Sequence, residues 1–261
     1  MPPQMRSPTT QLRYALYLAP PTESELWRFG CDVIGRDAMT GASCDGFAPE
    51  GYPPDSWRNM TSEPRRYGFH ATLKAPFRLR VDLDVADLIN NVAEFAYKFA
   101  PFDAGQLEVG AIATGEGRAF VVLKPQGALT ELRSFEGSVV RALDPMRAPL
   151  TDGERQRRES ARLTPRQAYY LDAWGYPYVL DEFRPHFTLT NAVLDADSVA
   201  RSLEREFRRR VASHALRVDA LTLFAESEPG GEFKILRRFP LGHARPARRS
   251  PSRARAPAIV D

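Results

Sequence analysis

Two of the four histidines occur in the same short pattern, a histidine followed two residues later by a threonine. The first pair is His70 with Thr72, and the second is His186 with Thr188. Residues i and i+2 of a β-strand face the same side, so each strand would present an imidazole beside a hydroxyl. We expect no metal at either pair, because neither phrase is His-x-His and no carboxylate lies within two residues of either histidine.

Two imidazoles that face one cleft are suited to acid–base chemistry at a phosphodiester. Because the unperturbed pKa of histidine is about 6.5, one ring can be neutral and the other protonated near neutral pH. The neutral ring would remove a proton from the attacking oxygen, and the charged ring would protonate the departing oxygen. The threonine hydroxyls would donate hydrogen bonds to the non-bridging oxygens. Such a reaction requires no cofactor, and the spacing leaves open which histidine is the base.

The same alternation extends each polar face by one more residue. Lys74 continues the face of His70 and Thr72, and Thr190 continues the face of His186 and Thr188. We therefore expect four substrate-binding residues, which are Thr72, Thr188, Lys74 and Thr190.

The elements around the two phrases repeat, in the order strand, helix and two-stranded hairpin, at 67–124 and again at 185–240. Apolar periodicity predicts strands at 13–19, 67–73, 106–113, 118–124, 185–191, 216–226 and 233–240, and helices at 85–99, 129–143 and 197–213. Two copies of such a unit predict an α+β fold with two related lobes rather than a solenoid, which needs three or more copies.

Two long connections and both ends of the chain lie outside this repeat. The segment 35–66 is rich in glycine and proline and is either a lid or a surface insertion, and 144–182 is a connector with a basic stretch. Residues 1–11 and 242–261 are polar, with proline in both, and are expected to be disordered tails. The expected domain is therefore 12–241.

The overall charge is basic, with 36 Lys+Arg against 33 Asp+Glu and a pI near 8.9. Residues 243–261 hold five of the arginines and one aspartate, so the remainder has 31 basic and 32 acidic residues. That balance argues against a surface built for nucleic acid. No run approaches the roughly 18 apolar residues of a membrane span, no secretory leader is evident, and two cysteines suit a reducing compartment. We expect a cytoplasmic monomer.

The two phrases, Arg-Tyr-Gly-Phe-His-Ala-Thr-Leu-Lys-Ala-Pro-Phe at 66–77 and Arg-Pro-His-Phe-Thr-Leu-Thr at 184–190, resemble those of the 2H phosphoesterase superfamily. The resemblance covers about residues 12–241 and is to its bacterial DUF1045 branch, found in phosphonate-utilisation operons. It implies a bilobal, pseudo-twofold fold with two antiparallel sheets beside a central cleft, helices on the outer faces, and lobes that exchange their first strands. It also implies metal-independent catalysis, with His70 and His186 as the acid–base pair and Thr72 and Thr188 holding the phosphate.

The expected function is that of a hydrolase, a cyclic phosphodiesterase that opens a small cyclic phosphate ester of a nucleotide or ribose phosphate. Arginine clusters at 155–166 and 208–210 leave open an RNA 2′,3′-cyclic-end processing enzyme, although such clusters are also typical of solvated surfaces. A third possibility is a non-catalytic protein that binds phosphate esters.

Overall fold

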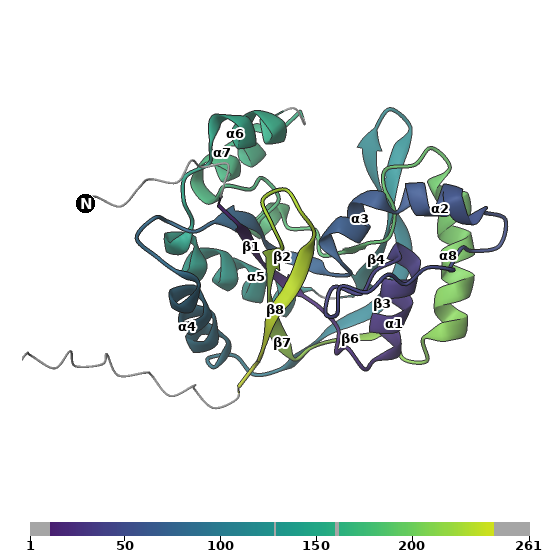
Figure 1. The fold of residues 1–261 in the computed structure, drawn as a ribbon, viewed down its shortest axis with the longest axis horizontal. Coiled ribbons are helices and arrows are strands. Elements are labelled where there is room, and N and C mark those ends of the chain that lie inside the picture. The colour runs from purple at the N-terminus through teal and green to yellow at the C-terminus, as the bar shows by residue number, and fades with distance from the viewer. Residues whose placement is uncertain (1–10, 128, 160–161, 243–261) are drawn as a thin grey trace, which may run out of the picture.

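The fold is built on one eight-stranded sheet with helices packed on it (Figure 1). The computed structural model describes residues 11–127, 129–159 and 162–242. The strand order is β6-β3-β4-β5-β2-β1-β7-β8, and every pairing is antiparallel. The strands are β1 (Arg13–Leu18), β2 (Ala71–Arg78), β3 (Phe102–Gly115), β4 (Arg118–Gln126), β5 (Phe187–Thr188), β6 (Ala215–Val218), β7 (Ala220–Glu226) and β8 (Phe233–Pro240). The predicted α+β class is confirmed.

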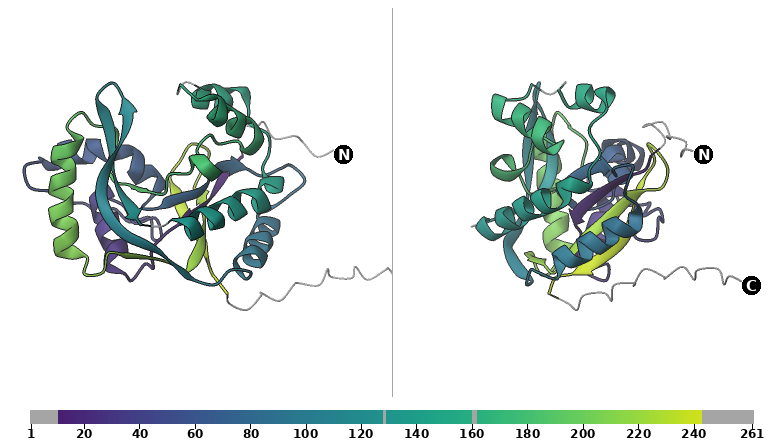
Figure 2. Two further views of the ribbon diagram at one scale, coloured as in Figure 1. Left: turned by 180° about the vertical axis from the view of Figure 1, so that it is seen from behind. Right: turned by 90° about the vertical axis from the view of Figure 1, so that its left-hand side faces the viewer.

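The helices cover the sheet at its two ends (Figures 1 and 2). They are α1 (Glu25–Ile34), α2 (Pro54–Met60), α3 (Ser62–Tyr67), α4 (Val85–Ala96), α5 (Thr130–Leu143), α6 (Asp152–Glu159), α7 (Pro165–Trp174) and α8 (Ala196–Arg210), with short 3-10 turns η2 (Asp144–Met146) and η3 (Leu180–Glu182). Helix α8 packs on β3 and β4 and contacts α1, whereas α5 packs on β2 and α4 on β7 and β8. The two helix groups therefore support opposite halves of the sheet.

The expectation of two separate sheets is corrected by strand β5, which joins the halves into one sheet. Although only two residues long, β5 pairs with β2 through Phe187 and Ala71, and with β4 through Thr188 and Val122. Both edges of β5 are thus occupied, and no free edge remains between the halves. The strand expected at 185–191 is reduced to these two residues.

The repeat is visible in the way the strands are shared between halves. Strand β2 lies beside β1, which pairs in turn with the β7–β8 hairpin, whereas β5 lies beside the β3–β4 hairpin. The first strand of each repeat therefore sits with the hairpin of the other repeat. The single strand expected at 216–226 is two strands separated at Asp219, because β6 pairs with β3 and β7 pairs with β1 at the other end. This run of chain crosses from one half of the sheet to the other.

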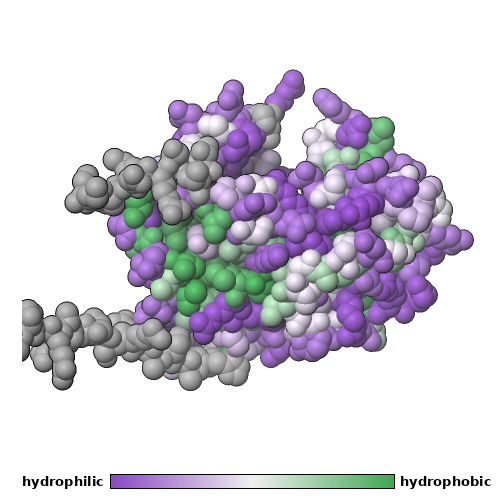
Figure 3. Space-filling view, viewed as in Figure 1, coloured by the Kyte–Doolittle hydropathy of each residue, from purple (hydrophilic) through white to green (hydrophobic). Residues whose placement is uncertain are grey.

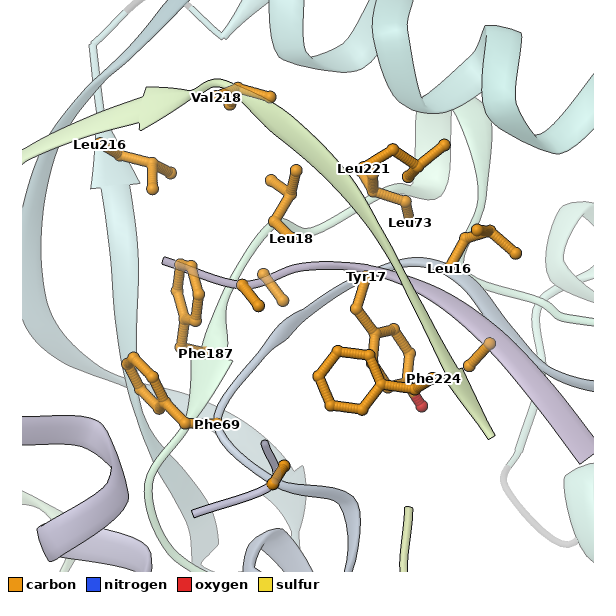
Figure 4. Close-up of a cluster of buried hydrophobic side chains, with 14 of the residues drawn as sticks. Leu16, Tyr17, Leu18, Phe69, Leu73, Phe187, Leu216, Val218, Leu221 and Phe224 are labelled. Atoms are coloured by element: carbon orange, nitrogen blue, oxygen red, sulfur yellow. The ribbon is translucent and has the colours of Figure 1, made fainter. Parts of the chain in front are cut away.

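One apolar core joins the two phrases from beneath the sheet (Figure 4). Phe69 and Phe187 are fully buried, and their rings stack with centroids 4.9 Å apart. Gly30 of α1 permits this packing, because a Cβ at that position would lie 2.2 Å from the ring of Phe69. The residue before the first histidine therefore contacts the residue after the second.

The segment 35–66 is a packed support that carries α2 and α3. Trp57 is 2% exposed and donates its indole N–H to the carbonyl of Val33 at 2.9 Å. Asn191, just after the second phrase, donates from its backbone N–H to the carbonyl of Met60 and from its side chain to that of Asn59. The segment thus connects the chain before the first phrase with the chain after the second.

The predicted tails fall almost entirely outside the described ranges. None of the helices in the described part of the chain combines the length and hydropathy that a bilayer-spanning segment requires.

Candidate active site

The register between β2 and β5 brings the two histidine phrases side by side. Ala71 pairs with Phe187 in an antiparallel ladder, so one residue to either side His70 lies opposite Thr188 and Thr72 lies opposite His186. The register therefore places the two phrases side by side, and the hydroxyl that lies 3.3 Å from Nε2 of His70 is that of Thr72 in its own phrase. By ordinary sheet geometry the two histidines are diagonal neighbours, with Cβ atoms about 7 Å apart.

The burial pattern shows that all four side chains project from one face. His70, Thr72, His186 and Thr188 are partly exposed. The residues between and beside them are buried, and they are Phe69, Ala71, Leu73, Phe187 and Leu189. This is the division that strand alternation predicts, and it holds in both phrases.

The imidazole of His70 is held in one tautomer by the backbone. Its Nδ1 lies 2.8 Å from the carbonyl oxygen of Gly68, which can only accept, so Nδ1 carries the proton. Its Nε2 is then the unprotonated nitrogen, and the hydroxyl of Thr72 lies 3.3 Å from it. Gly68 has φ of 81° and ψ of 169°, a conformation that side chains disfavour. Glycine here turns its carbonyl toward the ring.

The imidazole of His186 repeats the arrangement. Its Nδ1 lies 2.6 Å from the carbonyl oxygen of Arg184, again two residues earlier in the chain. In the neutral ring this leaves Nε2 as an acceptor on the site face. Both phrases therefore fix the same tautomer by the same local bond, which the sequence spacing alone does not reveal.

The surroundings of the two rings differ. His70 stacks on Tyr17 with centroids 3.6 Å apart and planes at 18°, and the rings of Tyr67 and Phe224 lie at 6.4 Å and 6.1 Å. This burial lowers the pKa of His70 to about 4, against a smaller opposing effect of the Gly68 bond. Burial also lowers the pKa of His186, and the nearby charge of Arg184 adds to that effect. At a pKa of about 4 the ring of His70 is neutral at pH 7.

Tyr17 was not anticipated as part of the site. It lies opposite Thr72 in the β1–β2 ladder and is 1% exposed. The apolar run that predicts a strand at 13–19 contains no signal for this pairing, because the register with β2 is a non-local property.

Lys74 lies on the same face as His70 and Thr72, but its charge is already compensated. Its side chain is 4% exposed, and Nζ donates to Asp144 Oδ1 at 2.9 Å. Asp144 also accepts from Arg147. The expected contact of Lys74 with substrate is therefore corrected to a buried ion pair that ties β2 to the end of α5.

Thr190 is fully buried and has a structural part. Its hydroxyl accepts from the backbone N–H of Val121 at 3.1 Å and donates to the carbonyl of Asn191 at 2.8 Å. Because β5 ends at Thr188, the alternation that would carry Thr190 to the site face does not continue. Thr190 is therefore removed from the substrate-binding set.

The connector 144–182 packs beside the site face of β2. Its Ala148 donates to the carbonyl of Arg78, and Arg158 of α6 donates to the carbonyl of Pro76 at 3.2 Å. In the space-filling view a notch separates the α6–α7 region from the tip of the β3–β4 hairpin, and the surface at its base is largely hydrophilic (Figure 3). The described part of the connector is therefore folded against the C-terminal half of β2.

No group of three or more His, Cys, Asp or Glu side chains that could hold a metal ion occurs within the described ranges. The groups that the geometry does bring together are two imidazoles and two hydroxyls. They can exchange protons and donate hydrogen bonds to an anion.

Comparison with known proteins gives relatives of three kinds. The family model "Protein of unknown function (DUF1045)" matches residues 72–234. Two proteins named ribose 1,5-bisphosphate phosphokinase PhnN, from Janthinobacterium sp. (strain Marseille) and Laribacter hongkongensis (strain HLHK9), are 33% identical over 239 residues and 32% identical over 228 residues. These matches cover 90% and 87% of this chain but 52% and 51% of the relatives, so the chain spans about half their length.

Among solved structures, Escherichia coli LigT complexed with NADP+ matches with a TM-score of 0.44 and 15% identity, over 90% of this chain and 99% of that one. TT0787 of Thermus thermophilus matches with a TM-score of 0.43 and 17% identity, over 88% and 98%. Kluyveromyces marxianus Usb1 with uridine monophosphate matches at 0.39 and 12%, over 89% and 100%. The family model covers more than half of the sequence, and the chain belongs to the DUF1045 family.

Proposed function

We propose that this protein is a phosphoesterase that opens a cyclic phosphodiester by acid–base catalysis between its two histidines. The observation that carries the proposal is the pair of imidazoles on adjacent strands, each with Nδ1 bound to a carbonyl and Nε2 left for substrate. The threonine hydroxyls of both phrases lie in the same two adjoining segments, with that of Thr72 at 3.3 Å from Nε2 of His70. A mirrored set of proton acceptors and hydrogen-bond donors suits a reaction in which one oxygen enters phosphorus and another leaves.

In the proposed reaction His70 is the base and His186 is the acid. Nε2 of His70 takes the proton of a water whose oxygen attacks phosphorus. The bond from phosphorus to one ring oxygen breaks, and Nε2 of His186 gives its proton to that oxygen. The assignment follows from the more enclosed position of His70 and its pKa of about 4. A bound anionic phosphate would raise the pKa of His186 toward the protonated form that an acid requires.

The threonine hydroxyls would stabilise the charge that remains on phosphorus. Thr72 and Thr188 each lie opposite a histidine, so both can donate to non-bridging oxygens while the two rings act on the entering and leaving oxygens. Stabilisation of this charge by hydroxyl groups needs no metal ion, and we expect activity in the presence of a chelator.

A small substrate is favoured over RNA by the state of the arginine clusters. In the cluster at 155–166, Arg155 pairs with Asp172 and Glu159 and Arg166 pairs with Asp181, whereas Arg158 forms no ion pair within the described ranges. The cluster at 208–210 is also paired, through Arg208 with Glu204, Arg209 with Glu206 and Arg210 with Asp32. Arginines already paired with carboxylates contribute little to phosphate-backbone binding.

The proposed substrate class is a cyclic phosphate ester of a ribose phosphate or nucleotide, and the proposed context is phosphonate metabolism. Its support is the resemblance to a branch found in phosphonate-utilisation operons, together with two relatives named for a ribose bisphosphate. We also propose that the protein acts as a cytoplasmic monomer.

The test is a panel of cyclic phosphodiesters, assayed with and without EDTA, on the full chain and on His70→Ala and His186→Ala. We expect hydrolysis in EDTA and a loss of at least about 100-fold in each variant, as for removal of a general acid or base. Full activity in either variant would contradict the two-histidine mechanism. A ligand that stabilises the protein thermally and is recovered unchanged would instead identify a binding protein.

A further inference from the structure

Helix α6 places an arginine beside the continuation of the site face. The Nη2 of Arg158 donates to the carbonyl of Pro76 in β2 at 3.2 Å, and its guanidinium carbon lies 5.7 Å from the ring centroid of Tyr176. A small cavity beside β2 is lined by Arg158 and Tyr176 together with Lys74, Pro76, Arg78 and one carboxylate, that of Glu154. Arg158 is therefore held at the inner side of the connector rather than in open solvent.

Arg158 forms no ion pair within the described ranges, although the charge of Glu154 acts to raise its pKa. The carboxylate of Glu154 already accepts hydrogen bonds from the guanidinium of Arg78 and from the backbone N–H and hydroxyl of Thr151. Burial lowers the pKa of Arg158 from its usual value. A partly buried cation without an anion is an unfavourable feature that a bound anion would relieve.

The carboxylates near Arg158 are already paired with other cations. Lys74 and Arg147 share the single carboxylate of Asp144. Arg13, whose charge also acts on Arg158, is paired with Glu226. These cations thus have acidic partners, whereas Arg158 forms no ion pair within the part of the chain that the structure describes.

Aromatic side chains lie beside both Arg158 and His70. Tyr176 lies beside Arg158 and Tyr17 stacks on His70, and the pKa of Tyr17 is raised mainly by burial with smaller effects of Tyr67 and Tyr176. Pro76, which anchors Arg158, is four residues along β2 from Thr72, about 13 Å in an extended strand. The guanidinium can therefore meet a group some ångströms away from the reacting phosphorus, but not the reacting phosphate itself.

We propose that Arg158, with Tyr176 beside it, binds a second anionic group of the substrate, a phosphomonoester carried by the same sugar as the cyclic phosphate. A phosphomonoester carries close to two negative charges at neutral pH and offers three acceptor oxygens, which match the planar donors of arginine. This inference rests on the proposed function, because it names the substrate class of the same site. On this proposal a residue of the connector determines which substrates the site selects.

The experiment compares two probes that differ only in this group, adenosine 2′,3′-cyclic phosphate with and without a 5′-phosphate. We expect the full chain to favour the 5′-phosphorylated probe in kcat/KM by about 10- to 100-fold, the scale of charge-assisted hydrogen bonds. Arg158→Met keeps the apolar stem and removes the charge, and should abolish this ratio. Arg158→Lys keeps the charge and should retain part of it.

The matched control is Arg155→Met, one turn away on the same helix, where the guanidinium pairs with Asp172 at the surface. It should leave the ratio unchanged. Equal kcat/KM for the two probes on the full chain would overturn the proposal, as would an unchanged ratio in a folded Arg158→Met. The full-chain comparison needs no variant and stands if the substitution prevents folding.

Binding separates failure of this inference from failure of the proposed function. If no cyclic ester is hydrolysed, the phosphoesterase proposal fails, and calorimetry with adenosine 3′,5′-bisphosphate and adenosine 3′-monophosphate still tests Arg158. Tighter binding of the bisphosphate that is lost in Arg158→Met supports the second anion site. Equal affinity of the two ligands for the full chain refutes it.

Discussion

The environment of His70 predicts that this one side chain makes folding stability dependent on pH. The ring is enclosed by Tyr17, Tyr67 and Phe224 and has a pKa of about 4, whereas histidine in an unfolded chain titrates near 6.5. Between those two pH values the unfolded chain binds a proton that the native ring does not. The stability that this ring contributes is therefore complete above pH 6.5 and falls as the pH decreases toward 4.

The magnitude follows from the difference in pKa. A shift of about 2.5 units at 1.36 kcal/mol per unit corresponds to about 3 kcal/mol. Of this, about 2 kcal/mol should be lost between pH 7.5 and pH 4.5, after allowance for solvent at the partly exposed edge of the ring. The variant His70→Gln lacks the titrating group, so its stability should fall by about 2 kcal/mol less over the same range.

The assay is urea denaturation of both proteins at a series of pH values, read by tryptophan fluorescence. Taking the difference between the two proteins cancels the carboxylates and other histidines that titrate in both. Nitrogen-15 spectra of the imidazoles give an independent readout, in which His70 should titrate near pH 4 and carry its proton on Nδ1. Parallel loss of stability in the two proteins would refute the reasoning, and so would a midpoint near 6.5 or a proton on Nε2.

Two further substitutions test the packing that positions the site, each read by urea denaturation. Gly30→Ala should destabilise the protein by about 1–3 kcal/mol, because the new methyl would lie 2.2 Å from the ring of Phe69. The control is Gly153→Ala, whose Cβ would meet nothing closer than 3.7 Å and which should be neutral or stabilising. Equal effects of the two substitutions on stability would contradict this account. Asp144→Asn should cost about 3–5 kcal/mol, because it leaves two buried cations without a carboxylate. It should cost more than Lys74→Met, which leaves Asp144 paired with Arg147, and the reverse order would show that the carboxylate depends on the lysine.

Much of the fold can be predicted from the sequence where a signal is local. The strand–helix–hairpin repeat, the α+β class and the helices expected at 85–99, 129–143 and 197–213 correspond to elements that the structure contains. The errors lie where pairing between distant segments decides. The run 216–226 reads as one strand but serves opposite halves of the sheet, and 185–191 reads as a strand of seven residues although only Phe187 and Thr188 pair.

The site residues also separate into those that a local pattern predicts and those that it does not. The spacing of His70 with Thr72 and of His186 with Thr188 is sufficient to predict that each pair shares a face, because alternation is a property of a single strand. For Lys74 the shared face holds, but a buried carboxylate already occupies its charge. For Thr190 the alternation does not continue, because the residue follows the end of its strand.

By itself the sequence determined which side chains can do chemistry and which of them point the same way, since both depend on residues two positions apart. Only the tertiary structure decided that the two histidine phrases lie side by side, that Tyr17 stacks on His70 in buried surroundings that lower its pKa, and that Arg158 of the connector forms no ion pair within the described ranges. The physical reason is that register, burial and charge compensation arise between segments that are far apart in the chain. No local pattern of residue types encodes them.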